Sequence, residues 1–260
     1  MKKTIITGFI CFFFISLLAA CGAQKESSSG ESDTAKDKTI LKMATSADFP
    51  PFESYDTDGS FIGFDVELAQ AIADELGYEL QIEDMDFDGL IGALQANRVD
   101  MVLAGMSATE DRQKNVNFST EYHRSGEMFI SKPDDEIKDI EDLSGKVVGV
   151  QLGTIQEEGA EALAAEYGFE VKKVDDASIL IQELNSNRID VAYMDKTVAT
   201  GYIDSQGFVG FDDPTTSSPG MAIAFPKYSE IVEEVNAALA KFEEDGTMEK
   251  LKEEWLSEIE

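Results

Sequence analysis

Residues 99–112 carry a set of side chains that suits a carboxylate ligand. An apolar run in this segment ends at Gly105, and Ser107, Thr109 and Arg112 follow it. If Thr109 caps a helix, Arg112 lies in the first helical turn, where backbone N–H groups and the helix dipole favour an anion. A guanidinium can hold a planar carboxylate through two hydrogen bonds. The segment therefore predicts a carboxylate site at the end of a buried strand, and the alternative is a solvated arginine on a surface helix.

Around this segment, the sequence alternates between strand and helix patterns. Short apolar runs predict strands at residues 40–44, 78–82 and 99–103. The apolar spacing between them is helical at residues 65–76, with Asp65 as the expected cap, and again at residues 89–97. This order predicts a parallel, doubly wound sheet whose ligand loops lie at the carboxyl ends of the strands.

A second unit with the same plan begins near Asp142. Strands are predicted at residues 146–150, 170–174 and 189–194, and helices at residues 157–167 and 178–187. The units are also similar in sequence, because Asn-Arg-Val-Asp at 97–100 is repeated as Asn-Arg-Ile-Asp at 187–190. In this register Asp195 corresponds to Gly105. We interpret the units as two lobes, each with a polar group at the end of an equivalent strand. Chance similarity between two units of one type is the alternative.

Three further segments complete the folded part. The pair Asp58-Gly59 predicts a hairpin turn, which is favoured over a calcium loop because apolar residues interrupt the ligand positions. The apolar run at 219–225 is expected to return the chain to the first lobe. A helix with a regular apolar face is expected from residue 229 onward, and Trp255 is expected to pack in the core.

The composition argues against several classes of function. The 260 residues include 21 basic and 52 acidic side chains, a formal net charge of −31. Nucleic acid is not an expected partner, because phosphate binding needs a basic face. The only histidine is His123, and the two cysteines are Cys11 and Cys21. We therefore expect no metal site, no cofactor and no enzyme, because no nucleophile with an adjacent base is visible.

The N-terminus has the pattern of a processing signal. Residues 1–20 combine two lysines with an apolar run, and the following Leu-Ala-Ala-Cys, which ends at Cys21, resembles a bacterial lipobox. Residues 21–38 have almost no apolar side chains and are expected to form a flexible tether. We expect a lipid on Cys21 to anchor the protein to the outer face of the cytoplasmic membrane, as in Gram-positive bacteria. An ordinary secretory signal or an uncleaved anchor is the alternative.

Many short motifs in a fixed order connect the chain to a known family. They include Phe-Pro-Pro-Phe-Glu at 49–53, Gly-Phe-Asp-Val at 63–66, and the segments 87–94, 105–112, 118–119, 149–156, 188–190 and 245–247 ahead of Trp255. In this order they resemble the substrate-binding proteins of polar amino-acid ABC importers, solute-binding protein family 3. The resemblance covers nearly everything from residue 38 to residue 255.

The resemblance implies a fold and a function. The fold is α/β, of the periplasmic-binding-protein-like type II, with two doubly wound lobes joined by two crossover strands that close like a clam shell. Residues 39–127 and 222–260 are expected to form lobe 1, and residues 128–221 lobe 2. The protein is expected to be a monomer that captures a free polar amino acid and delivers it to the membrane subunits of an ABC permease.

The resemblance also implies roles for individual residues. The residues expected around the backbone groups and side chain of the ligand are Phe49, Phe87, Gly105, Ser107, Arg112, Thr154, Ile155 and Asp195. Arg112 is expected to bind the carboxylate, with help from Ser107 and the backbone N–H groups of residues 153–155. Asp195 and the Gly105 carbonyl are expected to bind the ammonium group, while the two phenylalanines enclose the side chain. The alternatives are core packing for the phenylalanines and a simple helix cap for Asp195.

Ligand preference is expected to depend on four more positions. They are Ser46, Glu53, Gln151 and Met194. Ser46 stands where several relatives carry an aspartate, whereas Glu53, the acidic composition and a pair of phenylalanines suit arginine or lysine. Arginine is slightly favoured, and glutamine or another neutral polar amino acid remains open. Two other functions also stay open, a cyclohexadienyl dehydratase on the same fold and a sensor or adhesin.

Overall fold

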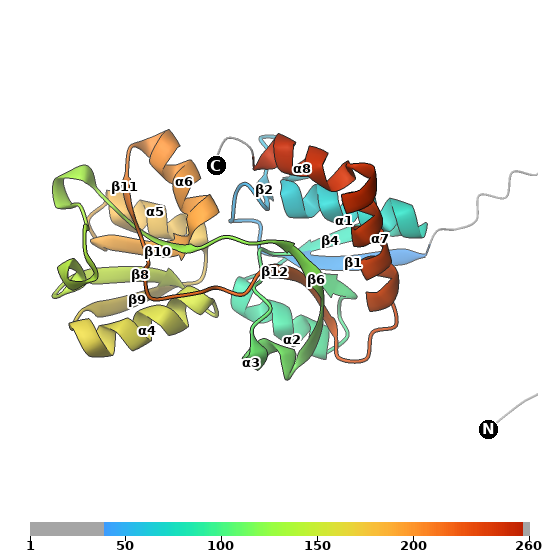
Figure 1. The fold of residues 1–260 in the computed structure, drawn as a ribbon, viewed down its shortest axis with the longest axis horizontal. Helices are drawn as coiled ribbons and strands as arrows, with labels where there is room; N and C mark the ends of the chain where they lie inside the picture. Colours follow the sequence, from blue (N-terminus) through green and yellow to red (C-terminus); the bar gives the residue numbers. More distant parts are fainter. Residues whose placement is uncertain (1–38, 257–260) are drawn as a thin grey trace, which may run out of the picture. The chain divides into compact units, whose positions relative to one another are not determined.

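The computed structural model of the protein describes residues 39–256, which form two five-stranded sheets with helices packed on them (Figure 1). The expected signal peptide, the lipidated Cys21 and the tether lie outside the described residues. No helix in the described part is long and apolar enough to cross a membrane. The hairpin predicted at Asp58-Gly59 is confirmed, because β2 (Ser54–Tyr55) pairs antiparallel with β3 (Phe61–Ile62).

The first sheet has the strand order β4-β1-β5-β12-β6. Its strands are β1 (Ile40–Thr45), β4 (Glu79–Asp84), β5 (Met101–Val102), β6 (Val116–His123) and β12 (Met221–Pro226). Strand β1 pairs in parallel with β4 and β5, as the alternation of strand and helix predicts. Strand β12 pairs antiparallel with β5 and β6, so the apolar run near residue 220 does return to this sheet.

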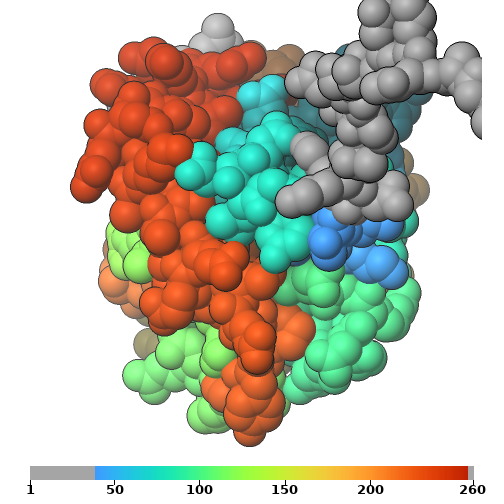
Figure 2. All heavy atoms as spheres, turned by 90° about the vertical axis from the view of Figure 1, so that its right-hand side faces the viewer, coloured from blue at the N-terminus to red at the C-terminus, as the bar shows by residue number. Residues whose placement is uncertain are grey.

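Helices from both ends of the chain pack together on the first sheet. They are α1 (Phe64–Leu76), α2 (Leu90–Gln95), α3 (Glu110–Gln113), α7 (Val232–Asp245) and α8 (Thr247–Trp255), with a short 3-10 turn, η1 (Phe87–Gly89). Helix α7 packs against β6, α1 and α8. Figure 2 shows α7 and α8, in orange-red, beside the turquoise α1. Trp255 packs against the buried cluster beneath these helices, as expected.

The second sheet has the order β11-β7-β10-β8-β9. Its strands are β7 (Glu127–Ser131), β8 (Val147–Gln151), β9 (Glu170–Val174), β10 (Val191–Asp195) and β11 (Val209–Asp212). Three helices pack on it, α4 (Ile155–Tyr167), α5 (Ala177–Asn185) and α6 (Lys196–Gln206), and two 3-10 turns, η2 (Pro133–Asp135) and η3 (Ile140–Leu143), precede β8. Strand β8 pairs in parallel with β9 and β10, so the core of this sheet repeats the plan of the first.

The sequence repeat has the same conformation in both sheets. Asn97 and Asn187 are the non-glycine residues with a positive φ, 52° and 54°, among those described. Three residues later, the carboxylates of Asp100 and Asp190 each accept a 2.8 Å hydrogen bond from the backbone of the neighbouring parallel strand, from Lys42 in β1 and Val147 in β8. Each motif therefore ends a helix and fixes the start of the strand that follows it.

The chain crosses twice between the sheets. The first crossing, at residues 124–126, joins β6 to β7, and the second, at residues 213–220, joins β11 to β12. Figure 1 shows both segments running between the two sheets. The protein is thus an α/β protein with two lobes and a double connection, as the resemblance implies.

The prediction that Asp65 caps α1 is wrong. The helix begins at Phe64, and Gly63 is the N-cap residue. A Cβ atom on Gly63 would lie 2.2 Å from the Phe52 carbonyl oxygen, so the preceding loop packs directly on the helix start. Asp65 consequently lies inside the first turn with its carboxylate buried, and it accepts a hydrogen bond from the Gly105 N–H at 2.8 Å.

Candidate ligand-binding site

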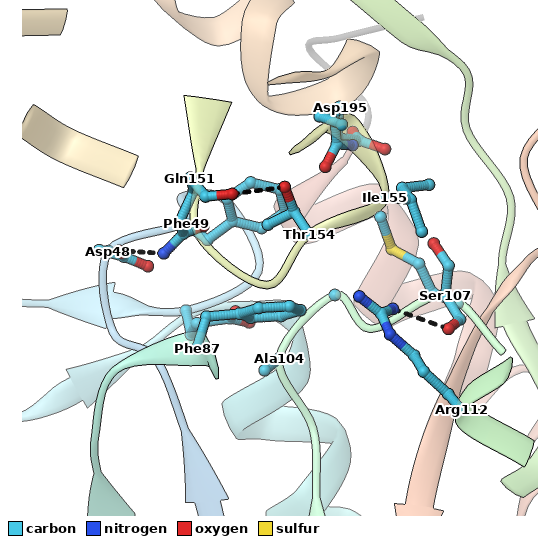
Figure 3. A pocket seen from close by; sticks show the side chains of 14 residues that line it. Asp48, Phe49, Phe87, Ala104, Ser107, Arg112, Gln151, Thr154, Ile155 and Asp195 are labelled. Atoms are coloured by element: carbon cyan, nitrogen blue, oxygen red, sulfur yellow. Dashed lines mark hydrogen bonds between the residues drawn. The ribbon is translucent and has the colours of Figure 1, made fainter. Parts of the chain in front are cut away.

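A cavity lies between the sheets, at the carboxyl ends of their parallel strands (Figure 3). The residues predicted at the ligand that line this cavity are Phe49, Glu53, Phe87, Gly105, Ser107, Arg112, Gln151, Thr154, Ile155 and Asp195. Ser46 and Met194 do not line it. The structure adds four lining residues that the sequence reasoning missed, Asp48, Ala104, Gln156 and Met221.

The cavity is nearly closed in this conformation. Its volume is about 20 Å³, which is room for about one water molecule. Direct hydrogen bonds join the lobes across it. Arg112 donates to the Gly153 carbonyl oxygen at 2.9 Å, and Asp48 accepts from Gln151 Nε2 at 2.8 Å and from the Ala177 N–H at 2.6 Å. An amino acid therefore enters only after the lobes separate and these groups change partners.

Arg112 is positioned by the helix start that the sequence predicts. Thr109 is the N-cap of α3, and its Oγ1 accepts from the Arg112 N–H at 3.2 Å. The guanidinium donates to the Ser107 carbonyl oxygen at 2.9 Å from one side and to the second lobe from the other. Burial lowers the pKa of Arg112 to about 10, so the group stays charged at neutral pH. A partly desolvated guanidinium with further N–H groups suits a carboxylate.

The turn at 153–155 offers fewer backbone donors than expected. The Gly153 N–H donates to Glu157 Oε2 at 2.6 Å, so it is already paired within its own lobe. Thr154 caps α4, accepting from the Glu157 N–H at 3.2 Å and donating to the Gln151 carbonyl oxygen at 2.7 Å. The N–H groups of Thr154 and Ile155 are the donors of this turn that remain for a carboxylate. They lie at a helix N-terminus, where the dipole favours an anion.

Asp195 caps a helix and also lines the cavity. It ends β10 and caps α6, and its Oδ1 accepts from the N–H groups of Thr197 at 2.7 Å and Val198 at 3.4 Å. Its side chain also lines the cavity. Burial raises the pKa of Asp195 to about 6, against the opposing effect of these N–H donors. The carboxylate is therefore ionised at neutral pH and suits a cationic group.

Gly105 is required where Phe49 covers the end of β5. Its φ is 55°, and a Cβ atom on it would lie 2.9 Å from Cε1 of Phe49. The opposite wall is Phe87, whose ring centroid lies 5.4 Å from Cζ of Arg112. Figure 3 shows Phe49 and Phe87 between two polar ends of the site, with Ser107 and Arg112 at one end. The walls suit an aliphatic or planar side chain.

Asp48 occupies the other polar end and was not predicted. Its Oδ1 accepts from the Ser46 hydroxyl at 3.1 Å, while its Oδ2 accepts the two bonds from the second lobe. Burial raises the pKa of Asp48 to about 6, with the Ala177 N–H acting against the rise. Ser46 thus supports the carboxylate instead of facing the cavity. The one available signal was that Asp48 directly precedes Phe49, which sequence reasoning had placed in the site.

Of the other specificity positions, Glu53 and Gln151 line the cavity as predicted, and Met194 does not. Met194 packs in the buried core, because neighbouring residues of a strand face opposite ways. Glu53 lines the cavity but is fully buried, and burial with nearby Asp65 raises its pKa well above the usual value. Gln156 also lines the cavity, and its side-chain amide donates to Glu127. Burial raises the pKa of Glu127 to about 8.

Metal binding finds no support in this part of the chain. Among residues 39–256 no group of three or more histidine, cysteine, aspartate or glutamate side chains is arranged to hold a metal ion. His123 does not line the cavity. It ends β6 beside the first crossing, where its Nε2 lies 3.3 Å from Thr197 Oγ1 and its ring packs on Phe52.

Comparison with known proteins finds close matches over the described region. The family model for bacterial extracellular solute-binding proteins, family 3, matches residues 41–258. The arginine-binding extracellular protein ArtP of Bacillus subtilis is 46% identical over 244 residues, which cover 92% of each chain. A solved ancestral arginine-binding protein bound to arginine matches with a TM-score of 0.80 at 41% identity, covering 84% of this chain and 99% of that one. One bound to glutamine matches with a TM-score of 0.79 at 42% identity, covering 84% and 98%.

Proposed function

The chain belongs to the bacterial extracellular solute-binding proteins of family 3, and we propose that it captures free arginine between its two lobes. It serves as the substrate-binding protein of an amino-acid ABC importer and passes its ligand to the permease. Lysine is the next ligand in preference, and glutamine is the neutral alternative. The order follows from the charges that line the site.

One observation carries the proposal: three charged groups lie along the cavity between the lobes, which we call the slot. Arg112 and Asp195 offer a cation and an anion from different lobes, the pair that a zwitterionic amino acid needs. Asp48 lies at the opposite end, beyond the two phenylalanine rings (Figure 3). An amino acid with a long stem and a cationic tip matches all three groups. Closure then removes the pairs from water and strengthens them.

Asp48 is the group that favours arginine over glutamine. A guanidinium can donate two hydrogen bonds to its carboxylate and cancel its charge, whereas a glutamine amide is neutral and leaves the charge buried without a cation. The names of similar proteins support this order, since ArtP is an arginine-binding protein. Because an ancestral arginine-binding protein is also solved with glutamine bound, glutamine is the comparator in the test.

Calorimetric titration tests the proposal. The chain from residue 22 onward is unfolded and refolded to remove any bound ligand, and each common amino acid is then added in turn. We expect arginine to bind with a Kd of about 1 μM or below, lysine to bind more weakly, and glutamine more weakly again. If glutamine binds more tightly than arginine, the assignment of Asp48 is wrong while the importer function stands. If no amino acid binds, the importer function itself fails.

The enzymatic alternative is not favoured, because no histidine or cysteine lines the slot. His123 lies outside the cavity, and burial lowers its pKa to about 4, so it is neutral at pH 7. The carboxylates of Asp48 and Asp195 already accept hydrogen bonds from neighbouring N–H groups and the Ser46 hydroxyl. We expect no turnover of prephenate or arogenate, and product formation from either would revive the dehydratase. A sensor or adhesin role is tested by deleting the permease, because a pure uptake protein then loses its phenotype.

The membrane anchor is proposed from the sequence alone. Cys21 follows a lipobox-like tetrapeptide, and a lipid there, with the tether at 21–38, holds the folded part outside the cytoplasmic membrane. We expect Cys21→Ala to move the protein from the membrane fraction to the medium in a Gram-positive host. Retention of the variant in the membrane fraction means that an uncleaved signal is the anchor. Sedimentation of the folded part is expected to give a monomer.

A further inference from the structure

Two carboxyl groups are buried side by side behind the slot. Glu53 and Asp65 each have 0% of their surface exposed. The local backbone brings them together, because the turn at 49–53 packs on the start of α1. The Asp65 N–H donates to the Phe52 carbonyl oxygen at 2.9 Å. The Phe52 backbone packs so closely on Gly63 that position 63 has no room for a side chain. The Phe-Pro-Pro-Phe-Glu and Gly-Phe-Asp-Val motifs therefore meet at this pair.

The oxygen atoms of the pair need one proton. Oδ2 of Asp65 accepts from the Gly105 N–H at 2.8 Å and from the Tyr122 hydroxyl at 2.7 Å. With both carboxyls ionised, Oδ1 of Asp65 and both oxygens of Glu53 have no donor among the described residues. The two carboxyl groups act on each other electrostatically, and neighbouring buried carboxyl groups can form a hydrogen bond with each other only if one of them carries a proton. A proton on Glu53 gives Oδ1 of Asp65 its donor.

The surroundings place that proton on Glu53. The charges that act on Glu53 are those of Asp65 and Asp48, both negative, and no cation of the described residues acts on it. Burial and these charges raise the pKa of Glu53 well above its usual value. Asp65 receives two other donors, so its pKa rises only to about 6. Neighbouring His123 on β6 is neutral, and the Tyr122 hydroxyl keeps its proton.

We infer that Glu53 is a neutral acid that donates to Asp65 and so holds the Gly105 peptide in its binding conformation. Gly105 lies under the Phe49 ring with a φ of 55°, and Asp65 holds its N–H. The Gly105 carbonyl is the group expected to accept from the ligand ammonium, so this step rests on the proposed function. Glu53 is thus a positioning residue that acts through Asp65, and it is not the counter-charge that the sequence suggested.

Infrared spectroscopy of the ligand-free protein tests the protonation state directly. We expect the spectrum at pH 7 to lose one carbonyl band of a protonated carboxyl in Glu53→Gln, while the band of Glu127, whose pKa burial raises to about 8, stays in both proteins. The same change at Glu79, an exposed residue of the same lobe, is the matched control and is expected to leave the band in place. Absence of a difference band between the wild type and Glu53→Gln overturns the inference. This result does not depend on whether any amino acid binds.

The pH dependence of unfolding gives a second ligand-free readout. The pKa of Glu53 is raised in the folded state, so the folded protein binds one more proton than the unfolded chain above about pH 4.5. Wild-type stability should therefore fall as the pH rises from 5 to 8, relative to Glu53→Gln. The folding equilibrium constant should change by up to about tenfold per pH unit. Parallel profiles of the two proteins contradict a proton on Glu53.

Binding measurements separate positioning from simple packing. Glu53→Gln keeps an N–H donor for Asp65, whereas Glu53→Leu removes the donor and keeps a similar volume. We expect arginine to bind at least about tenfold more weakly to the leucine variant than to the glutamine variant. Equal affinities of the two variants overturn the positioning role, even if the infrared band shows the proton. If the wild type itself binds no amino acid, the proposed function fails, and the two ligand-free tests still decide the state of the pair.

Discussion

Replacing Asp48 by Asn changes the charge at the far end of the slot with almost no change in shape. In the present conformation the carboxylate holds Gln151 and the Ala177 N–H of the second lobe. Both bonds end on Oδ2, so an asparagine oxygen in its place can still accept them, but as a neutral acceptor, and closure is weakened by about 1 kcal/mol for every ligand. Arginine loses in addition the charge-assisted bonds to its guanidinium, about 1.5–3 kcal/mol.

These terms predict a change in preference and not only in affinity. The Kd for arginine should rise by about 50-fold to several hundred-fold in Asp48→Asn, whereas that for glutamine should rise by about fivefold at most. The ratio of the two constants therefore moves by at least about tenfold toward glutamine. Calorimetric titration of both ligands into wild type and variant measures this ratio. Equal losses for the two ligands would refute the reasoning, because Asp48 would then act only in closing the lobes.

The pH dependence gives an independent check on the same residue. Burial raises the pKa values of Asp48 and Asp195 to about 6, and each carboxylate must be ionised to pair with a cation. Affinity should therefore fall as the pH drops through 6, because binding then has to release the protons. Arginine uses both carboxylates, so its log Kd should approach a slope of about two per pH unit between pH 5 and 4. Glutamine, or arginine with Asp48→Asn, should approach a slope of about one.

Three other changes probe the remaining groups. Arg112→Ala should abolish binding of every amino acid in calorimetry and leave the circular dichroism spectrum unchanged; an unchanged affinity would mean that the carboxylate binds elsewhere. Asp195→Asn should weaken arginine and glutamine alike by about 2–5 kcal/mol, because the ligand ammonium is then buried without its counter-charge, and a loss confined to arginine would contradict this role. Burial lowers the pKa of His123 to about 4, so the unfolded chain binds more protons below pH 6.5. The wild-type melting temperature should fall from pH 6.5 to 4 more steeply than that of His123→Gln, and equal slopes would argue against a buried neutral imidazole.

The features that depend on short-range signals could be predicted from the sequence. Thr109 caps α3 as expected, because a side-chain cap acts within one turn of the helix. The alternation of apolar strands and amphipathic helices gave the parallel plan of both sheets, since a helical crossover forces neighbouring strands to run parallel. Asp195 and Gly105 were placed at equivalent strand ends by the repeat alone, and both line the cavity.

Side-chain direction in irregular segments could not be predicted. In an extended chain Ser46 and Asp48 would lie on one face. The structure instead has a backbone hydrogen bond of 2.7 Å from the Asp48 N–H to the Ser46 carbonyl oxygen, which turns Asp48 toward the slot. The state of Glu53 was equally hidden, because it depends on a contact with Asp65 that exists only once the loop packs on α1. Strands β6 and β7 were missed, because polar residues break the apolar pattern of β6 and the crossing follows it directly.

The contacts that hold the lobes together are made by the same side chains that are proposed to bind the ligand. Arg112 bonds the Gly153 carbonyl, and Asp48 bonds Gln151 and the start of α5, so the two ends of the slot are already joined across the cleft. A ligand enters by replacing these direct bonds with bonds through itself. Arginine carries a carboxylate for Arg112 and a cation for Asp48, so it can replace both, whereas glutamine can replace only the first without leaving a buried charge unpaired. Preference for arginine would then be expressed as the completeness of closure, and a permease that reads the closed form would receive arginine selectively even when glutamine is more abundant.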